Sequence, residues 1–244
     1  MAARTEVDRP VRVTGLVPDP RRPGCIRVQI EYPALGEEGE AGEAAAATVA
    51  SLPRGDRGRA GRVLLTVPAE VAQGLGLQVD GPLSAPDEET LARAADAEAA
   101  FRTALGCLER RPYARRDLER RLVLRGHPPE AAIAAVGKAA ELGLLDDEKF
   151  TRHYIETRFA RGRGPGRLRR ELTGLGVAPA LVDRLLTETI PADRASERML
   201  TLARKRAAQL QGLDRNTRLR RVVAYLARRG YRGGEVREVV ARLV

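Results

Sequence analysis

The stretch Phe150–Gly176, FTRHYIETRFARGRGPGRLRRELTGLG, decides how the rest of the sequence is interpreted. Its first part carries apolar side chains at helical spacing. The segment Gly162–Gly166, GRGPG, cannot continue that helix, because proline lacks an amide hydrogen and glycine favours turns. A second short helix is predicted to follow. Arginine recurs throughout, so the stretch predicts two amphipathic helices with a dense cationic surface.

The second helix of this stretch belongs to a pattern that occurs three times. In each copy, two apolar residues four apart are followed four residues later by a glycine. The copies are Leu118, Leu122 and Gly126; Leu168, Leu172 and Gly176; and Val222, Leu226 and Gly230. Glycine at this place is typical of a helix that ends in the left-handed conformation. The glycines lie 50 and then 54 residues apart, which leaves room for two further helices in each copy.

We therefore predict a mainly α-helical chain, in which tandem three-helix repeats form an elongated array. The expected limits of the repeats are 86–143, 144–190 and 191–244. The first repeat should open with a long helix from Pro86 to about Arg111, ahead of a proline. Asp146 is expected to cap the helix that opens the second repeat, and Pro191 and Asp193 to act similarly at the start of the third.

Residues 1–85 have a different pattern and are predicted to form a small strand-rich module. Val11–Thr14, Ile26–Tyr32 and Arg62–Val67 alternate apolar and polar residues, the period of a strand with one buried face. A short helix should open at Pro68 and end near Gly74 or Gly76. Residues 33–61 offer almost nothing to bury, and we expect them to form a mobile insertion.

The net charge of +10 is unevenly distributed. Residues 1–88 hold 10 arginines against 13 acidic residues, whereas residues 89–244 hold 33 basic against 20 acidic residues. Such a field attracts polyanions, nucleic acid first and an acidic protein surface second. Cys25 and Cys107 are isolated, and no segment has the apolar length of a signal peptide or a membrane span. We expect a cytoplasmic protein with reduced cysteines.

The arginines of the predicted middle helices and of the GRGPG loop are the candidate binding residues. A solvated helix face is the commonest role of charged runs, but few carboxylates are placed here for pairing four residues away. A surface for a polyanion or an acidic partner is therefore favoured. Arg158 is a separate case, because it falls on the apolar arc of its helix and could equally be a structural residue. The candidate set is Arg116, Arg120, Arg158, Arg161, Arg163, Arg167, Arg169, Arg170, Arg218, Arg221 and Arg228.

Motifs for catalysis or for a cofactor are not evident. The carboxylates of Asp146–Glu148 are expected to satisfy free amides at a helix start rather than to bind metal. His127 and His153 lack the spacing of metal ligands. The GRGPG loop lacks the pattern of a phosphate-binding loop, and no strand precedes it. We therefore predict a protein that is not an enzyme and needs no cofactor.

Several segments resemble the RecX family, the bacterial regulators of the RecA recombinase. The most specific are Leu142–Phe150, LGLLDDEKF, then Arg158, Gly164–Leu172, GPGRLRREL, and Gly176–Val177. Weaker similarity covers Ala104–Gly126 and the segment from Val67 to Leu77, and the third repeat agrees mainly in its helix pattern. Residues 33–61 depart from the family as an insertion.

The resemblance implies an elongated chain of three-helix repeats that lies in the groove of a RecA filament on single-stranded DNA. There it would suppress ATP hydrolysis, strand exchange and coprotease activity. The implied partners are the RecA nucleoprotein filament and single-stranded DNA, with double-stranded DNA as a further ligand, and we expect a monomer. Repeats that contact successive protomers would combine many weak, salt-sensitive contacts.

Two alternatives remain open at this point. An autonomous DNA-binding protein, such as a repressor with helix-turn-helix-like units, would prefer one duplex sequence over scrambled duplex. A nuclease would require turnover that depends on a divalent metal.

Overall fold

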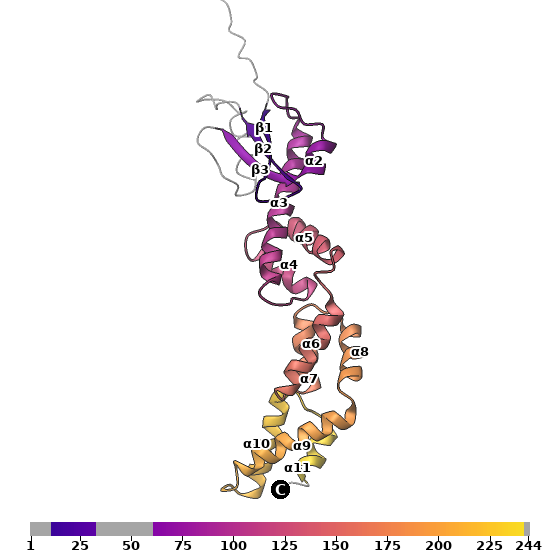
Figure 1. Ribbon diagram of the computed structural model, residues 1–244. Helices are drawn as coiled ribbons and strands as arrows, with labels where there is room; N and C mark the ends of the chain where they lie inside the picture. The colour runs from indigo at the N-terminus through magenta and orange to yellow at the C-terminus, as the bar shows by residue number, and fades with distance from the viewer. Residues whose placement is uncertain (1–10, 33–60, 242–244) are drawn as a thin grey trace, which may run out of the picture. The chain divides into compact units, whose positions relative to one another are not determined.

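The computed structural model describes residues 11–32 and 61–241 (Figure 1). Three strands precede a series of helices in this part of the chain, which confirms the predicted fold class of helical repeats with a small strand-rich module. The chain divides into two compact units. The first holds residues up to Gly106 together with Leu122–Lys138, and the second holds Cys107–Arg121 together with the chain from Ala139 onward. The predicted insertion at 33–61 lies, apart from Gly61, outside the described residues.

An antiparallel sheet forms the base of the first unit. Its strands are β1 (Arg12–Pro18), β2 (Cys25–Glu31) and β3 (Arg62–Pro68), with β2 in the centre. The alternating pattern places Val28 and Ile30 on the buried face. The strand β1 is longer than predicted, because its pairing shifts at a bulge next to Gly15 and then resumes to Pro18.

Two helices follow the sheet. The helix α2 (Ala69–Gly74) begins and ends where predicted and packs against β2 and β3 (Figure 1). The helix α3 (Ala85–Leu108) also matches its prediction, and its residues Leu91 and Ala95 belong to the same buried cluster as the sheet. The core of the strand-rich module therefore continues past residue 85 into α3.

The other helices of the first repeat are α4 (Arg115–Val123) and α5 (Pro129–Glu141). Leu118 and Leu122 are completely buried, as the apolar spacing requires. After α4 the chain turns at Gly126, whose φ of 91° confirms the left-handed stop.

The second repeat consists of α6 (Asp147–Ala160), α7 (Pro165–Gly174) and α8 (Pro179–Thr189). Its core joins Leu168 and Leu172 of α7 to residues of α6 and α8, among them Ile155, Val182 and Leu185. Asp146 caps α6 as predicted, since its carboxylate accepts hydrogen bonds from the backbone amides of residues 148 and 149, each at 2.9 Å. Gly176 has a φ of 89°.

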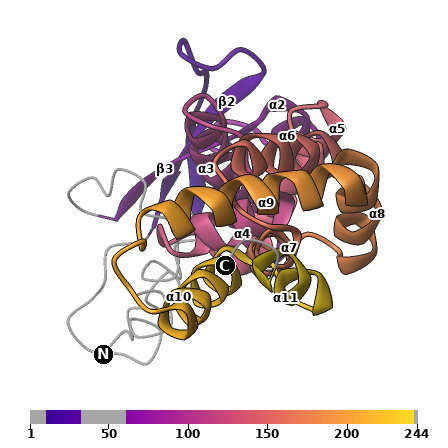
Figure 2. The same cartoon turned by 90° about the horizontal axis from the view of Figure 1, so that it is seen from below.

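The third repeat consists of α9 (Ala192–Ala208), α10 (Arg215–Arg229) and α11 (Gly234–Ala241), which Figure 2 shows grouped together. Val222 and Leu226 are buried in its core, and Gly230 ends α10 with a φ of 93°. The predicted capping by Asp193 is wrong. Pro191 occupies the cap without a side-chain hydrogen bond, so Asp193 lies inside the first turn of α9.

Candidate partner-binding surface and the joints between repeats

The first joint connects α4 of the first repeat to the second repeat. The guanidinium of Arg120 donates to the carbonyl of Gly174, at the end of α7, over 2.8 Å. The side-chain stem of Arg116 covers Gly176, where the Cβ of any other residue would lie only 2.5 Å from the Arg116 Cβ. At the other end of the contact, the amide of Arg115 donates to the Asp147 carboxylate over 2.9 Å.

The second joint connects the GRGPG loop to the end of α10. The amide of Gly164 donates to the carbonyl of Arg229 over 2.6 Å, and the amide of Gly166 donates to the carbonyl of Gly230 over 3.1 Å. Backbones can approach this closely only where side chains are absent. A Cβ on Gly164 would lie 2.9 Å from the Gly230 carbonyl carbon. The loop, predicted as a helix stop, thus also binds the next repeat.

Arginines of the third repeat strengthen the second joint by satisfying carbonyls at the end of α6. Arg229 donates to the carbonyls of Arg161 and Gly162, at 3.3 and 3.2 Å. Arg198 of α9 donates to the carbonyl of Ala160. These carbonyls have no partner within their own helix, and a cation near them also meets the negative end of the helix dipole.

Three of the candidate arginines are engaged in ion pairs inside the second repeat. Glu171 accepts hydrogen bonds from Arg163 at 2.5 Å and from Arg167 at 2.8 Å. Arg169 pairs with Asp183 of α8 at 2.6 Å. The expectation that few carboxylates are placed to pair with this helix is therefore wrong for its first turns.

The pKa of Glu171 reflects this environment. Burial alone would raise the pKa, but hydrogen bonds from Arg167, Arg163 and Tyr154 outweigh it and leave the pKa of the Glu171 carboxyl below its ordinary value. A carboxyl with a lowered pKa in the folded state stabilises the protein above its unfolded-state pKa. That contribution is lost as the pH falls through the folded-state pKa.

The substitution Glu171→Gln should therefore lower the melting temperature at neutral pH, and the deficit should shrink as the pH falls below about 4.3, the ordinary glutamate pKa. Thermal unfolding of both proteins between about pH 7 and pH 3 measures the difference. Glu156→Gln is the matched control, because Glu156 is exposed on α6 and pairs with no described residue. A deficit that stays constant with pH would contradict an ionic role for Glu171.

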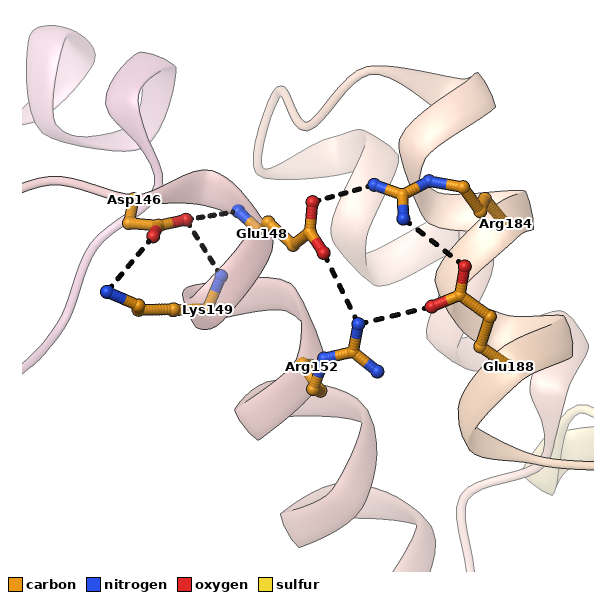
Figure 3. Close-up of polar contacts among 6 residues, drawn as sticks. All are labelled: Asp146, Glu148, Lys149, Arg152, Arg184 and Glu188. Carbon is orange, nitrogen blue, oxygen red and sulfur yellow. Dashed lines mark hydrogen bonds and ion pairs between the residues drawn. The ribbon is translucent and has the colours of Figure 1, made fainter.

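A closed ring of ion pairs ties α6 to α8 (Figure 3). Glu148 pairs with Arg184 at 2.7 Å and with Arg152 at 3.3 Å. Glu188 pairs with the same two arginines, at 3.2 and 3.1 Å. The hydrogen bond from Arg184 lowers the pKa of Glu148 below its ordinary value, more than the other favourable contacts do. The carboxylates of residues 146–148 thus have structural partners, as their position at a helix start indicated.

Two further candidates are half-buried. The guanidinium of Arg158 lies 5.3 Å from the centre of the Tyr154 ring, so this residue packs on its own helix. Arg218 of α10 holds its Nε buried, without an acceptor among the described residues. Neither arrangement leaves the whole guanidinium free for a partner.

The other candidates are exposed, and none of them forms an ion pair with a described carboxylate. We name them the exposed set: Arg116, Arg161, Arg170, Arg221 and Arg228. The middle helices of all three repeats contribute, since Arg116 lies on α4, Arg170 on α7 and Arg221 on α10.

Within residues 11–32 and 61–241 no group of three or more His, Cys, Asp or Glu side chains could hold a metal ion. In the same part of the chain, no helix combines the length and the apolar character of a membrane span.

Comparisons with known proteins place the chain in a family. A family model described as "RecX, second three-helix domain" matches residues 146–186, and one described as "RecX, third three-helix domain" matches residues 193–240. A protein named "Regulatory protein RecX" from Halorhodospira halophila is 35% identical over 147 residues, which cover 60% of this chain and 89% of that relative. The chain belongs to the RecX family. Its relative in Streptomyces coelicolor, of the same name, is 37% identical over 131 residues, 53% of this chain and 69% of that protein.

Solved RecX structures agree with the fold. A crystal structure of regulatory protein RecX superposes with a TM-score of 0.67 at 18% identity, over 95% of this chain and 99% of that one. RecX from Lactobacillus salivarius gives a TM-score of 0.54 at 18% identity, over 61% of this chain and 96% of that one. Membership of the RecX family assigns the chain a regulatory role, and both joints lie within or beside its matched three-helix domains.

Proposed function

We propose that this RecX protein binds the RecA filament on single-stranded DNA and inhibits its ATPase, strand-exchange and coprotease activities, without catalysis of its own. The exposed set is the observation that carries the proposal. Arg116, Arg170 and Arg221 lie on the middle helices of the three repeats, are exposed and form no ion pair with a described carboxylate, although the stem of Arg116 also covers Gly176 in the first joint. A polyanionic assembly with a regular repeat is the kind of partner that such a distribution fits.

Several weak contacts on one chain make binding tight, because the first contact raises the effective concentration of the others. Each exposed arginine contributes little by itself, since exposed ion pairs are typically worth about 0 to 1 kcal/mol. The arrangement therefore predicts strong dependence on salt, whether the acceptors are DNA phosphates or acidic residues of RecA. The salt dependence of binding measured separately with bare single-stranded DNA and with the RecA filament distinguishes the two acceptors.

The exposed set directs the choice of mutations. Charge reversal of Arg167 would also disturb Glu171 and the second joint, so Arg161→Glu with Arg170→Glu is the cleaner variant. We expect this double variant to need about tenfold more protein for half-inhibition of the RecA ATPase on single-stranded DNA, equivalent to about 1.4 kcal/mol of binding free energy. The melting temperature should stay close to that of the unmodified protein, because both side chains are exposed.

Arg204→Glu with Lys205→Glu is the matched control. These residues are exposed on α9, outside the candidate set, and the substitution changes the net charge by the same amount. Equal loss of inhibition in both double variants would mean that inhibition depends only on the net charge of the protein and not on Arg161 and Arg170. If the unmodified protein leaves the ATPase unchanged, or binds one duplex sequence more tightly than RecA-coated DNA, the filament proposal fails in favour of an autonomous DNA-binding protein.

A further inference from the structure

The two joints share two kinds of contact. In each joint, an arginine of one middle helix lies against the left-handed glycine that ends the middle helix of the next repeat. The pairs are Arg116 with Gly176, and Arg167 with Gly230. In each joint, an arginine also donates to the carbonyl two residues before that glycine, which is Gly174 in the first and Arg228 in the second. One half of a joint is therefore a basic helix face, and the other half is a helix end with free carbonyls.

In the first repeat, the corresponding helix end is the Gly126 end of α4, and no described residue covers it. Gly126 ends α4 with the same left-handed backbone as Gly176 and Gly230. No described atom lies within 4 Å of the place where its Cβ would be, whereas Gly230 is buried by Arg167. Leu124, two residues before Gly126, is 81% exposed, although a large apolar side chain gains from burial.

In the third repeat, the corresponding basic face lies on α10, and no described helix-ending glycine packs against it. When the repeats are aligned on their first core residue, Arg221 of α10 takes the place of Arg167, and Arg220 takes the place of Arg116. Both side chains are exposed, and no described glycine lies against either of them.

We propose that two copies of this chain associate head to tail, with the Arg220–Arg221 face of α10 in one copy covering the Gly126 end of α4 in the other. The second copy is the occupant that fits, because the same chain carries both complementary halves and twice joins such halves internally. A contact between two different surfaces does not close on itself, so further copies can add and form an open chain.

Electrostatic repulsion sets the conditions for this association. The net charge of +10 opposes contact between copies at low ionic strength, and roughly 0.15 M salt screens such repulsion beyond about 8 Å. Local basic residues do not prevent a joint, since the second joint forms around the carbonyls of Arg228 and Arg229. The proposal differs from the monomer expected from the sequence, and it does not depend on RecA or DNA.

Site-specific cross-linking tests the proposal without either partner. Leu124→Cys and Arg221→Cys are made separately in a Cys25→Ser background, which removes the partly exposed native thiol and leaves the buried Cys107. Under mild oxidation at about 0.15 M salt, a mixture of the two variants should give a several-fold higher yield of disulfide-linked dimer than either variant alone. A chain that carries both cysteines should give a ladder of multiples.

Leu124→Cys mixed with Arg204→Cys is the control, since Arg204 is exposed on α9 and is not part of the proposed contact. Equal dimer yields from the control mixture, the test mixture and the single variants would overturn the proposal. Sedimentation velocity of the unmodified protein is a second measurement. Its sedimentation coefficient should rise with protein concentration, and Arg221→Glu should abolish this rise. A sedimentation coefficient that stays constant over an about 100-fold range of protein concentration would likewise overturn the proposal.

Discussion

Replacing Leu168 by alanine should lower the free energy of unfolding by about 2 to 5 kcal/mol. Leu168 has no exposed surface and packs in the core of the second repeat with residues of α6 and α8. Removal of its side chain forfeits the burial of apolar surface and leaves a cavity that the surrounding helices fill only in part. Urea unfolding followed by circular dichroism measures the loss.

Leu142→Ala is the control for this substitution. The chemical change is identical, but Leu142 is 59% exposed, so we expect a change within about 0.5 kcal/mol. A Leu168→Ala protein as stable as the Leu142→Ala protein would mean that the helical register of α7 is wrong.

Leu168 also illustrates what could be predicted from the sequence. Its burial follows from the local pattern, because Leu168 and Leu172 are one helical turn apart and Gly176 stops the helix. The cap at Asp146 is equally local, since the residues that donate to it follow two and three positions later. Features whose partners lie within a few residues could be predicted.

The joints could not be predicted in this way. Gly164 donates to a carbonyl 65 residues further along the chain, and Arg120 donates to one 54 residues away. The pattern around Gly162–Gly166 predicts that a helix stops there, but it contains no information about which distant carbonyl the freed amides will meet. The small side chains of that loop were the available signal for a close backbone approach.

The choice of candidate arginines was limited in the same way, because their tertiary partners cannot be predicted from the local sequence. A run of arginines indicates positive charge but does not say which guanidinium groups the fold itself uses. Arg170 is exposed, while its neighbour Arg169 pairs with Asp183 on a different helix. Tertiary contacts therefore decide which of two adjacent arginines is available to a partner.

Gly230→Ala should destabilise the protein by about 2 to 5 kcal/mol, through two separate effects. The left-handed backbone at residue 230, with a φ of 93°, costs an L-amino acid about 1 to 2 kcal/mol. The added Cβ would also overlap the backbone nitrogen and the Cβ of Arg167, and relief of such overpacking costs about 1 to 3 kcal/mol more. Because the overlap involves backbone, the second joint must shift.

Gly126→Ala separates these two effects. Gly126 has nearly the same φ, 91°, but no described atom lies within 4 Å of its future Cβ, so only the backbone cost of about 1 to 2 kcal/mol is expected. Gly176→Ala should fall between the two, since its Cβ would lie 2.5 Å from the Arg116 Cβ, whereas the Cβ at residue 230 would come closer still and would also meet backbone atoms of Arg167. Urea unfolding should therefore rank the three proteins with Gly230→Ala least stable and Gly126→Ala most stable. Equal losses at Gly230 and Gly126 would mean that the glycine serves only to end its helix, and that the tight contact with Arg167 contributes nothing to stability.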